Sequence, residues 1–470
     1  MTEAANYDLA VIGGGSAGYA AARTAAKLGL HTVVIDGAEE LGGLCILRGC
    51  MPSKALIESG NRAITLKRAQ EFGLRGAGVA ADTAFIIDRK RRLVADFAAY
   101  RREQLATGGF DLVRGTARFV DSHRLAIARP DGVAHIAARA SVIATGSTIS
   151  VPALPGLEET GFWTSDTLLD APALPPSFII LGGGAVALEL AHYLEALNSR
   201  VTIIQRSSEV LTMMDADVAH VVAEAFRARG MTLFTQTRLL RVEKGSSGKR
   251  VVFEHNGAQH FVEAAEVLMA LGRRPAIEHL GLDAAQIEVA EGRIATLPTQ
   301  QTSQDNIFAA GDVCGPLEVV HLAIQQGEIA ARNAAALLRG ERAGHAMDYR
   351  SKLFGIFTHP EAAAIGLNEA EAEQEGREVL VGKYLFADHG KAMIMGETEG
   401  FVKLLGDARS GEILGASVVG PQATELIHEI AVAMHFRATA RQLAAAPHYH
   451  PTLSEIWTYP AEEIAEQVAD

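Results

Sequence analysis

The chain has 470 residues, of which 48% are hydrophobic, with a formal net charge of −13 and three cysteines. That length predicts about three domains around a large core, and the negative charge argues against nucleic acid and anionic membranes as partners. The apolar runs break well before the roughly 20 residues that span a membrane, and residues 1–10 lack the basic start and apolar core of a secretory signal, so we expect a soluble cytoplasmic enzyme.

The first predicted element is a buried strand, residues 7–12, which runs into a glycine-rich turn and an alanine-rich helix. In that turn Gly13 permits the sharp bend, Gly15 lets the backbone approach a pyrophosphate, and Gly18 lets helix and strand pack closely. A second strand then delivers Asp36, whose carboxylate can accept both hydroxyls of a ribose. This order of elements predicts a dinucleotide site rather than a glycine-rich turn in some other βαβ unit.

Cys45 and Cys50 follow directly, in the segment Gly42–Lys54. Two thiols this close in sequence, beside a bound cofactor, can cycle between a disulfide and a dithiol. Their place therefore suggests that electrons move between the cofactor and the sulfur pair. The alternatives are two buried core cysteines or a zinc site, but the sequence has no CxxC or HxxxH pattern that could supply the partner ligands of a zinc site.

The dinucleotide pattern recurs after a proline-rich connector. A predicted strand runs into Gly182 and Gly184, and the third glycine is replaced by Ala187, which still permits close packing. The next strand ends in Gln205 and Arg206. A neutral residue followed by an arginine suits the 2′-phosphate of NADPH better than a free 2′-hydroxyl. The alternative for Arg206 is an exposed surface charge.

Two nucleotide sites and a redox cysteine pair imply an electron path in which a nicotinamide gives hydride to a flavin and the flavin reduces the disulfide. Two further strand ends fit the flavin. One ends in Thr145 and Gly146, in a turn that can reach the cofactor. The other, within residues 302–312, ends in Asp312, which can hold a ribityl hydroxyl.

Taken together, these segments resemble the pyridine nucleotide-disulfide oxidoreductases, the flavoproteins that include dihydrolipoamide dehydrogenase, glutathione reductase and mercuric reductase. The likeness covers essentially the whole chain. It rests on the cysteine motif at Gly42–Lys54, Ala-x-Gly-Asp at 309–312, dimer-domain segments at 357–361, 365–367, 413–415 and 420–421, and His-Pro-Thr-x-Ser-Glu at 450–455.

The resemblance implies an α/β fold with two Rossmann-like nucleotide-binding domains and a C-terminal α+β dimerisation domain. The FAD domain is expected at residues 1–150 and 274–345, the NAD(P) domain at 151–273, and the interface domain at 346–470. The same likeness implies FAD and either NADP or NAD as cofactors, no metal, and a homodimer.

The family's cysteine motif also assigns roles. Cys45 would be the interchange thiol that meets substrate sulfur, and Cys50 would be the thiol that faces the flavin. Lys54 would pair with Glu189 near the flavin. Further residues expected at the cofactors are Gly43, Lys54, Ala117, His321 and Gly272.

By the same likeness His450, oriented by Glu455, would be the acid–base group that reaches the cysteines of the partner chain. The chemistry of this pair stands without the family, because only a thiolate is a nucleophile and a thiol therefore needs a positioned base. An imidazole with a carboxylate on its far nitrogen serves near neutral pH. Pro451 intervenes, so a turn must bring the two side chains together. Residues 448–450 alone would also fit a metal-binding tag or a core histidine.

Several positions depart from the family pattern. Arg48, between the cysteines, adds a cation that could lower a thiol pKa, unless it is simply solvated. Ala185 replaces a flavin-covering tyrosine, and Thr212 replaces a second arginine found in members strict for NADPH. Glu328 stands where glutathione reductases carry an arginine, whereas Arg23 matches another of their basic contacts.

Dihydrolipoamide or a related protein-bound dithiol is therefore the first expected substrate, and a small disulfide reduced by NADPH is the second. Mercuric reductase is a weaker rival, because residues 462–470 contain no cysteine pair to pass a soft metal ion inward. Cys314 is the remaining thiol, and we expect it to be structural. An alternative from another class is an FAD-binding redox sensor without turnover.

Overall fold

The computed structural model describes residues 5–75, 78, 80–246 and 248–468. The outermost residues of the predicted first and last domains, 1–4 and 469–470, lie outside this range. Two compact units are present. Unit 1 contains the chain up to Pro52, Arg89–Ser150 and Gly272–Asp348, and unit 2 contains Ser53–Asp88, Val151–Leu271 and the chain from Tyr349.

Unit 1 is built on a sheet whose centre is the long strand β6. Strand β6 pairs in parallel with β1 on one side and β18 on the other, and its first half pairs antiparallel with β5. The strands are β3 (Asp111–Arg114), β2 (Thr32–Asp36), β1 (Ala5–Ile12), β6 (Gly132–Ile143), β18 (Ile307–Ala309), β5 (Arg124–Arg129) and β4 (Thr116–Phe119). Because β1 and β2 are parallel and fully paired at their carboxyl ends, the turns that follow them lie at one edge of the sheet.

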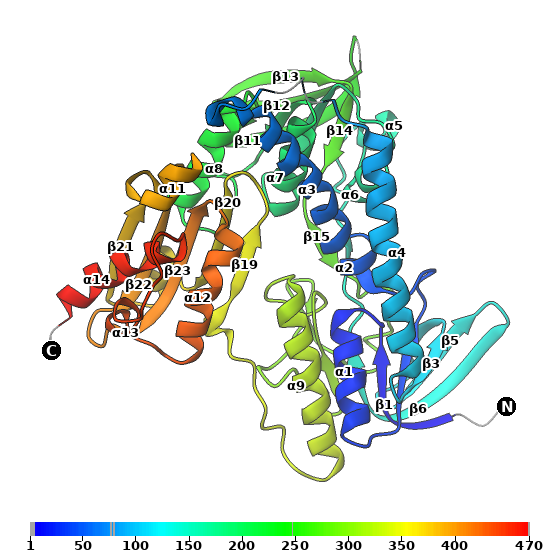
Figure 1. Cartoon of the computed structure of the whole chain (residues 1–470). Helices are drawn as coiled ribbons and strands as arrows, with labels where there is room; N and C mark the ends of the chain where they lie inside the picture. Colours follow the sequence, from blue (N-terminus) through cyan, green and yellow to red (C-terminus); the bar gives the residue numbers. More distant parts are fainter. Residues whose placement is uncertain (1–4, 76–77, 79, 247, 469–470) are drawn as a thin grey trace. The chain divides into compact units, whose positions relative to one another are not determined.

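Two helices of unit 1, α1 (Ser16–Lys27) and α9 (Val320–Leu338), lie side by side (Figure 1). Their backbones approach closely because α1 is rich in alanine and α9 carries Gly327, where a Cβ atom would collide with the carbonyl group of Ala17. Unit 1 also holds α2 (Gly43–Leu47), the later turns of α4 (Thr83–Thr107), and the strand pairs β7 (Ser147–Ile149) with β15 (Arg273–Pro275) and β16 (Val289–Ala290) with β17 (Arg293–Ile294).

Unit 2 begins with a second parallel sheet, in the order β10, β9, β8, β14. Its apolar strands and the helix after β8 repeat the arrangement of β1, α1 and β2 in unit 1, and a three-stranded antiparallel sheet follows. The elements are β8 (Ser177–Leu181), α7 (Ala185–Ala196), β9 (Arg200–Ile204), α8 (Ala216–Ala228), β10 (Thr232–Phe234), β11 (Thr237–Lys244), β12 (Lys249–His255), β13 (Ala258–Ala264) and β14 (Glu266–Met269), with α3 (Cys50–Lys67), η1 (Ala69–Phe72), α5 (Leu157–Thr160) and α6 (Ser165–Leu169).

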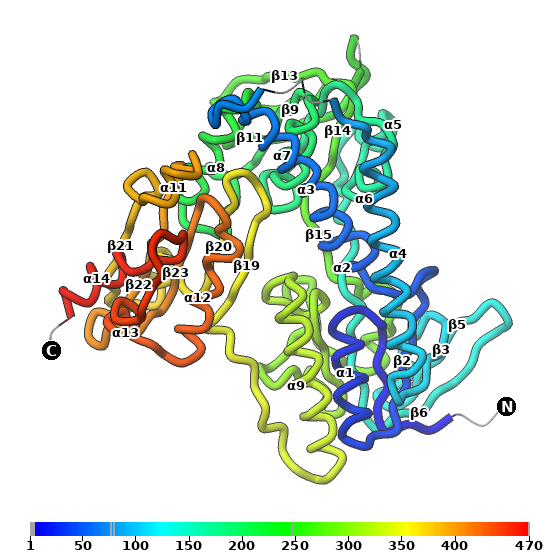
Figure 2. Tube along the Cα trace, in the orientation of Figure 1, coloured from blue at the N-terminus to red at the C-terminus, as the bar shows by residue number. Residues whose placement is uncertain are grey.

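The last part of unit 2 is an antiparallel five-stranded sheet, which Figure 2 shows with α12 and α14 beside it. Its strand order is β19 (Leu353–Ile356), β20 (Glu361–Gly366), β23 (Ile413–Gly420), β22 (Phe401–Asp407) and β21 (Val379–Leu385). The helical segments are η2 (Tyr349–Ser351), α10 (Glu369–Gln374), η3 (Phe386–Asp388), α11 (Gly390–Met395), α12 (Ala423–His435), α13 (Ala440–Ala444), η4 (Ser454–Trp457) and α14 (Thr458–Gln467).

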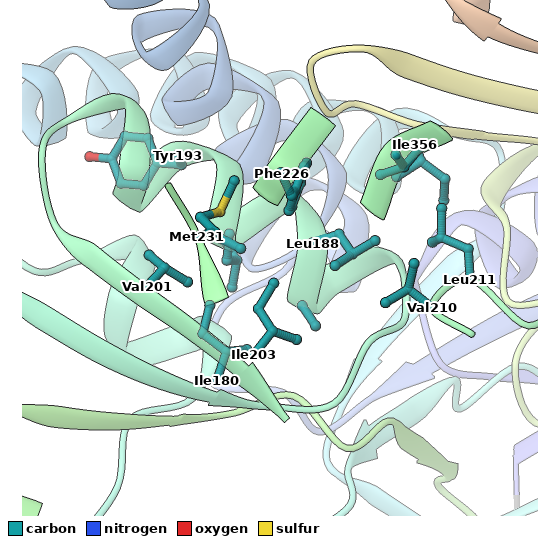
Figure 3. Packing of buried hydrophobic residues seen from close by; sticks show 14 of the residues in the cluster. Ile180, Leu188, Tyr193, Val201, Ile203, Val210, Leu211, Phe226, Met231 and Ile356 are labelled. Carbon is teal, nitrogen blue, oxygen red and sulfur yellow. The ribbon is translucent and has the colours of Figure 1, made fainter. Parts of the chain in front are cut away.

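The core of the second parallel sheet continues into this five-stranded sheet. Figure 3 shows Ile180, Val201 and Ile203 of β8 and β9 packed against side chains of α7 and α8, and Ile356 of β19 lies against Val210 and Leu211. The predicted fold class, two nucleotide-binding folds and a C-terminal α+β domain, is confirmed. Among the described residues, no helix is both long enough and apolar enough to cross a membrane.

A buried lysine joins these two parts of unit 2. Lys403 Nζ on β22 lies 2.8 Å from Asp215, 2.9 Å from Asp217 and 2.6 Å from Glu369, and its side chain is only 1% exposed. Burial alone would lower the pKa of Lys403, but hydrogen bonds to the three carboxylates outweigh burial and raise it. The ammonium group thus occupies the place that a cation would take among these acids.

Replacing this lysine should be costly, because it would leave three carboxylates facing one another. We expect Lys403→Met to lower the free energy of unfolding by about 3–5 kcal/mol, measured in urea. Lys383→Met is the matched control, since Lys383 Nζ also contacts Asp217 at 2.8 Å but is 39% exposed. That change should cost less than about 1 kcal/mol, and equal losses in the two variants would contradict this account.

Candidate active site

The cysteine segment of unit 1 lies directly against the first glycine-rich loop. Gly43, which begins α2, has a φ of +76°, and a Cβ atom there would lie 2.7 Å from Gly15 Cα. Glycine is thus needed at Gly43 both for its backbone conformation and for this close approach. Cys45 is on α2 and Cys50 begins α3, so both thiols are positioned from the turn that the two glycines bring together.

Both thiols are half-buried. A hydrogen bond to Cys50 raises the pKa of Cys45, burial raises it further, and the charge of Arg101 only partly offsets these effects. The pKa of the Cys45 thiol is therefore raised mainly by its close neighbour Cys50 and by burial.

The cation that acts on Cys45 was missed by the sequence analysis. Arg101, on α4, has its Nε and Nη1 atoms buried without a hydrogen-bond partner among the described residues, and its guanidinium lies 4.4 Å from the centre of the Tyr19 ring. Arg101 belongs to no motif, and only the fold reveals its place. Arg48, which the sequence analysis selected, is exposed at the end of α2.

Tyr19 also lies near Arg23, which matches a basic contact of glutathione reductases, and Arg23 pairs with Glu328, the position that departs from them. Arg23 lies 5.7 Å from the centre of the Tyr19 ring, and its Nη2 contacts Glu328 Oε1 at 2.8 Å. The pair is partly exposed, so it contributes little to stability. Its consequence is electrostatic, because Glu328 offsets the positive charge of Arg23 on α1.

The first glycine-rich loop fits the pyrophosphate of FAD. Helix α1 is capped by Gly15 without a side-chain hydrogen bond, so its first N–H groups face outward, and a Cβ at Gly13 would collide with Ala144. Gly18 is buried in α1. Asp36 accepts hydrogen bonds from the N–H groups of Gly14 and Ala38, each at 2.8 Å, which fixes its carboxylate at the end of β2.

Further residues predicted to contact a cofactor are also placed in unit 1. Thr145 Oγ1 donates to Ala276 O at 2.8 Å, and Gly146 follows it with a φ of +72°. Asp312 accepts a hydrogen bond from Ser147 Oγ at 2.6 Å. The side chain of Ala117 is buried in β4, so only its backbone is available. His321 is exposed in the first turn of α9. Gly272, with a φ of +101°, begins the segment Gly272–Asp348 of unit 1.

The second loop, in unit 2, fits a dinucleotide in the same way. Gly182 ends β8, α7 is capped by Gly184 without a side-chain hydrogen bond, and Ala187 is buried in that helix. Gln205 folds back toward Glu209 O, at 3.3 Å. Arg206 is exposed and has no side-chain partner among the described residues, which leaves its guanidinium available to a ligand.

A partly buried ion pair lies one helical turn beyond Cys50. Lys54 Nζ contacts Glu189 Oε1 at 3.0 Å and Oε2 at 2.9 Å, and it lies 4.6 Å from the centre of the Phe357 ring. The backbone N–H of Phe357 donates to Glu189 at 3.1 Å. Because residues four apart share a helix face, Cys50 and Lys54 point to the same side of α3.

The predicted acid–base pair is formed within unit 2. His450 Nδ1 lies 3.0 Å from Glu455 Oε2 and 3.1 Å from Oε1. The imidazole is 79% exposed, whereas the carboxylate is only 12% exposed. A buried carboxylate thus fixes one ring nitrogen and leaves the other to face outward, which is the arrangement a proton-transferring histidine requires.

Cys314 stands apart from the other thiols. Its Sγ donates to Gly311 O at 3.4 Å. Burial raises the pKa of Cys314 to about 12. A thiol that stays protonated at neutral pH is a poor nucleophile.

The family can now be assigned. Residues 7–327 match the pyridine nucleotide-disulphide oxidoreductase family, and residues 354–461 match its dimerisation domain. The chain belongs to this family. It is a disulfide oxidoreductase that uses FAD and NAD(P), as the sequence predicted, and it carries the domain through which the family dimerises.

Relatives of similar length support the assignment. The chain is 34% identical to a dihydrolipoyl dehydrogenase of Bacillus subtilis, with 96% of each chain covered, and 36% identical to one of Thermus scotoductus, with 98% of each covered. Among solved structures it resembles LpdA from Mycobacterium tuberculosis, at 29% identity and a TM-score of 0.87, over 98% of this chain and 99% of that one. It also resembles the flavoprotein disulfide reductase RclA from Escherichia coli, at 27% identity and a TM-score of 0.84, over 97% and 99%.

The expected roles of the two thiols lead to a spectroscopic prediction. If Cys50 is the thiol next to the flavin, two-electron reduction of the holoenzyme should produce a long-wavelength thiolate-to-flavin absorbance. Cys50→Ser should abolish this absorbance, and Cys45→Ser should keep or strengthen it, because only Cys50 would face the flavin. Exchanged outcomes for the two variants would reverse the roles of the thiols.

Proposed function

We propose that the protein is dihydrolipoamide dehydrogenase-like and oxidises dihydrolipoamide, free or attached to a protein, with the Cys45–Cys50 pair as the electron acceptor. The observation that carries this choice is the ion pair between Arg23 and Glu328, at 2.8 Å. Glutathione disulfide is anionic and needs uncompensated cations, whereas the amide of dihydrolipoamide is neutral. The names of the relatives from Bacillus subtilis and Thermus scotoductus support the same substrate.

The cysteines would act in two exchange steps. One thiolate of the substrate attacks Cys45 Sγ of the oxidised pair, so that a mixed disulfide forms and Cys50 leaves as the thiolate. The second substrate thiolate attacks the substrate sulfur of the mixed disulfide, which closes the lipoyl ring and releases Cys45. Bound FAD would take the two electrons from the reduced pair and pass them to NAD(P)⁺.

The protons would pass through His450. Its outward nitrogen accepts a proton from each substrate thiol in turn, and Glu455 at 3.0 Å holds the other nitrogen and stabilises the imidazolium. In the reverse direction the same nitrogen protonates a leaving thiolate. Lys54, paired with Glu189, would place a positive charge beside the flavin.

We further propose that the enzyme is a cytoplasmic homodimer in which His450 serves the cysteines of the second subunit, with neither nucleic acid nor membrane as a partner. The dimerisation domain and the exposure of His450, Tyr449 and Phe436 support this arrangement. The proposed domains are those expected from the sequence: FAD at 1–150 and 274–345, NAD(P) at 151–273, and interface at 346–470.

A substrate screen tests the proposal. Lipoamide, glutathione disulfide and other small disulfides, each offered with NADH or NADPH, should give the highest kcat/KM with lipoamide. A higher value with glutathione disulfide would favour the second candidate, an NADPH-dependent reductase of a small disulfide, in which the free guanidinium of Arg206 and the cation at Arg101 would take part. Flavin reduction without turnover of any disulfide would indicate a redox sensor.

The unpartnered Arg206 predicts the choice of nicotinamide. A guanidinium binds a 2′-phosphate through two hydrogen bonds, which a neutral side chain cannot do. We expect kcat/KM to be at least about tenfold higher with NADPH than with NADH, and Arg206→Ala to remove most of that margin. Thr212→Ala is the control, because its side chain carries no charge. A wild-type preference for NADH would contradict the prediction.

The pairing of His450 with Glu455 predicts which half-reaction depends on it. His450→Ala should slow thiol exchange by roughly 10²-fold or more, while hydride transfer from the nicotinamide, which needs no imidazole, stays nearly unchanged. Glu455→Gln should cost less, since a poorly oriented base still works part of the time. Stopped-flow measurement of each half-reaction shows which one depends on His450. Slowed flavin reduction with intact thiol exchange would refute the proposed role of His450.

Mixing chains tests whether the site is shared between subunits. His450→Ala and Cys45→Ser chains are each strongly impaired in this scheme, but their heterodimer would contain one site with an intact cysteine pair and an intact histidine. Activity should therefore return on mixing. If both functions lie within one chain, no intact site can form and the mixture stays inactive.

A further inference from the structure

The carboxylate of Glu455 has a second histidine beside it. His389 Nε2 lies 3.4 Å from Glu455 Oε1, the oxygen that also lies 3.1 Å from His450 Nδ1. His389 comes from a different part of unit 2, between η3 and α11, whereas Glu455 is on η4. The two histidines therefore reach one carboxylate from two segments that are far apart in the sequence.

His389 is buried and has an unmet hydrogen-bonding capacity. Its side chain is 1% exposed, and neither ring nitrogen has a hydrogen-bond partner among the described residues. Buried polar groups without partners are rare and costly. Glu455 Oε1 is the acceptor that these residues bring near it, and a small turn of either side chain would shorten the 3.4 Å contact to a hydrogen bond.

The surroundings suit a neutral donor rather than a second acid–base group. Burial lowers the pKa of His389, and the charge of His450 lowers it further, whereas the charge of Glu455 raises it. A neutral imidazole donates one N–H, and here Nε2 faces the carboxylate. The Tyr459 ring meets the His389 ring edge-on, with 6.5 Å between the ring centres. It stacks on the Tyr384 ring with 4.0 Å between the ring centres. Direct contact with a substrate is excluded by this burial.

We propose that His389 is a positioning residue for the acid–base pair, donating Nε2–H to Glu455 Oε1 so that the carboxylate holds His450 Nδ1 with both oxygens. This inference rests on the proposed role of His450. Glu455 can otherwise rotate about its last bond, and the His450 ring would lose its fixed orientation. His389 itself transfers no proton, and the two protons of the substrate thiols pass through His450 alone.

Two variants separate the hydrogen bond from the packing. His389→Met keeps most of the volume without a donor, and His389→Gln keeps an amide donor near the place of Nε2. We expect His389→Met to slow the thiol half-reaction of the holoenzyme by roughly tenfold, with KM for lipoamide unchanged because His389 does not touch the substrate. His389→Gln should stay within about threefold of wild type, and flavin reduction by NADPH should be unaffected in both.

A double-variant cycle excludes a merely structural role. If His389 acts through Glu455 and His450, then His389→Met should cause no further loss of thiol exchange in a chain that already carries His450→Ala. A further tenfold loss in that background, or equal losses in the Met and Gln variants, would overturn the proposal. If His389→Met does not fold, His389→Asn replaces it, because the shorter amide ends near Nδ1 and should not rescue.

The same measurements distinguish the two proposals. If His450→Ala slows thiol exchange but His389→Met does not, only the positioning role of His389 is wrong. If His450→Ala leaves thiol exchange intact, the proposed acid–base function is wrong, and the proposed positioning role of His389 is then wrong as well.

Discussion

The chemistry of unit 1 depends on the contact between two glycines. Gly43 approaches Gly15 so closely that a Cβ atom on Gly43 would lie 2.7 Å from Gly15 Cα. Gly15 caps the helix whose free N–H groups suit a pyrophosphate, and Gly43 begins the short helix that carries Cys45. A side chain at Gly43 would therefore push the thiols away from the loop that is built to hold the cofactor. In the proposed scheme electrons pass between sulfur and a flavin, so we expect this spacing to matter before any tuning of pKa values does.

Unit 2 contributes charges that are buried but partnered. Glu189 is held by Lys54 and a backbone N–H, Glu455 by His450, and Lys403 by three carboxylates. Each arrangement offsets the large cost of removing a charge from water. The three arrangements differ in whether a polar atom remains accessible to solvent. Lys403 is enclosed, whereas His450 presents one free ring nitrogen to the outside. The enclosed cluster fits a structural role and the open pair fits proton transfer.

Much of the fold and part of the site could be predicted because the signals are local. Each glycine loop stands between a strand and a helix in sequence. The pairing of His450 with Glu455 came from the family resemblance, and their spacing across Pro451 indicated only that a turn must bring them together. The Lys54–Glu189 contact was expected only from the family resemblance, since nothing in the spacing of those residues indicates it.

Arg101 and His389 could not be selected from the sequence because their contacts depend on tertiary packing. Arg101 is one of several arginines along α4, and only the packing of α4 against α1 stacks it on Tyr19. His389 looks like a loop residue after a strand, yet the fold buries it beside Glu455. A sequence pattern shows the periodicity and spacing of residues that are near one another in the chain. The contact partner of a single side chain outside any motif is instead determined by segments far away in the sequence. The same limit explains why Arg48 was selected, since proximity in sequence placed it beside the thiols.

The one-turn separation of Cys50 and Lys54 on α3 has an evolutionary consequence. Each inserted or deleted residue within that turn would rotate one side chain about 100° around the helix axis relative to the other. The thiol and the ammonium group would then point to different sides, however well the rest of the chain folded. We therefore expect evolution to exchange residue types within this turn more readily than to change its length.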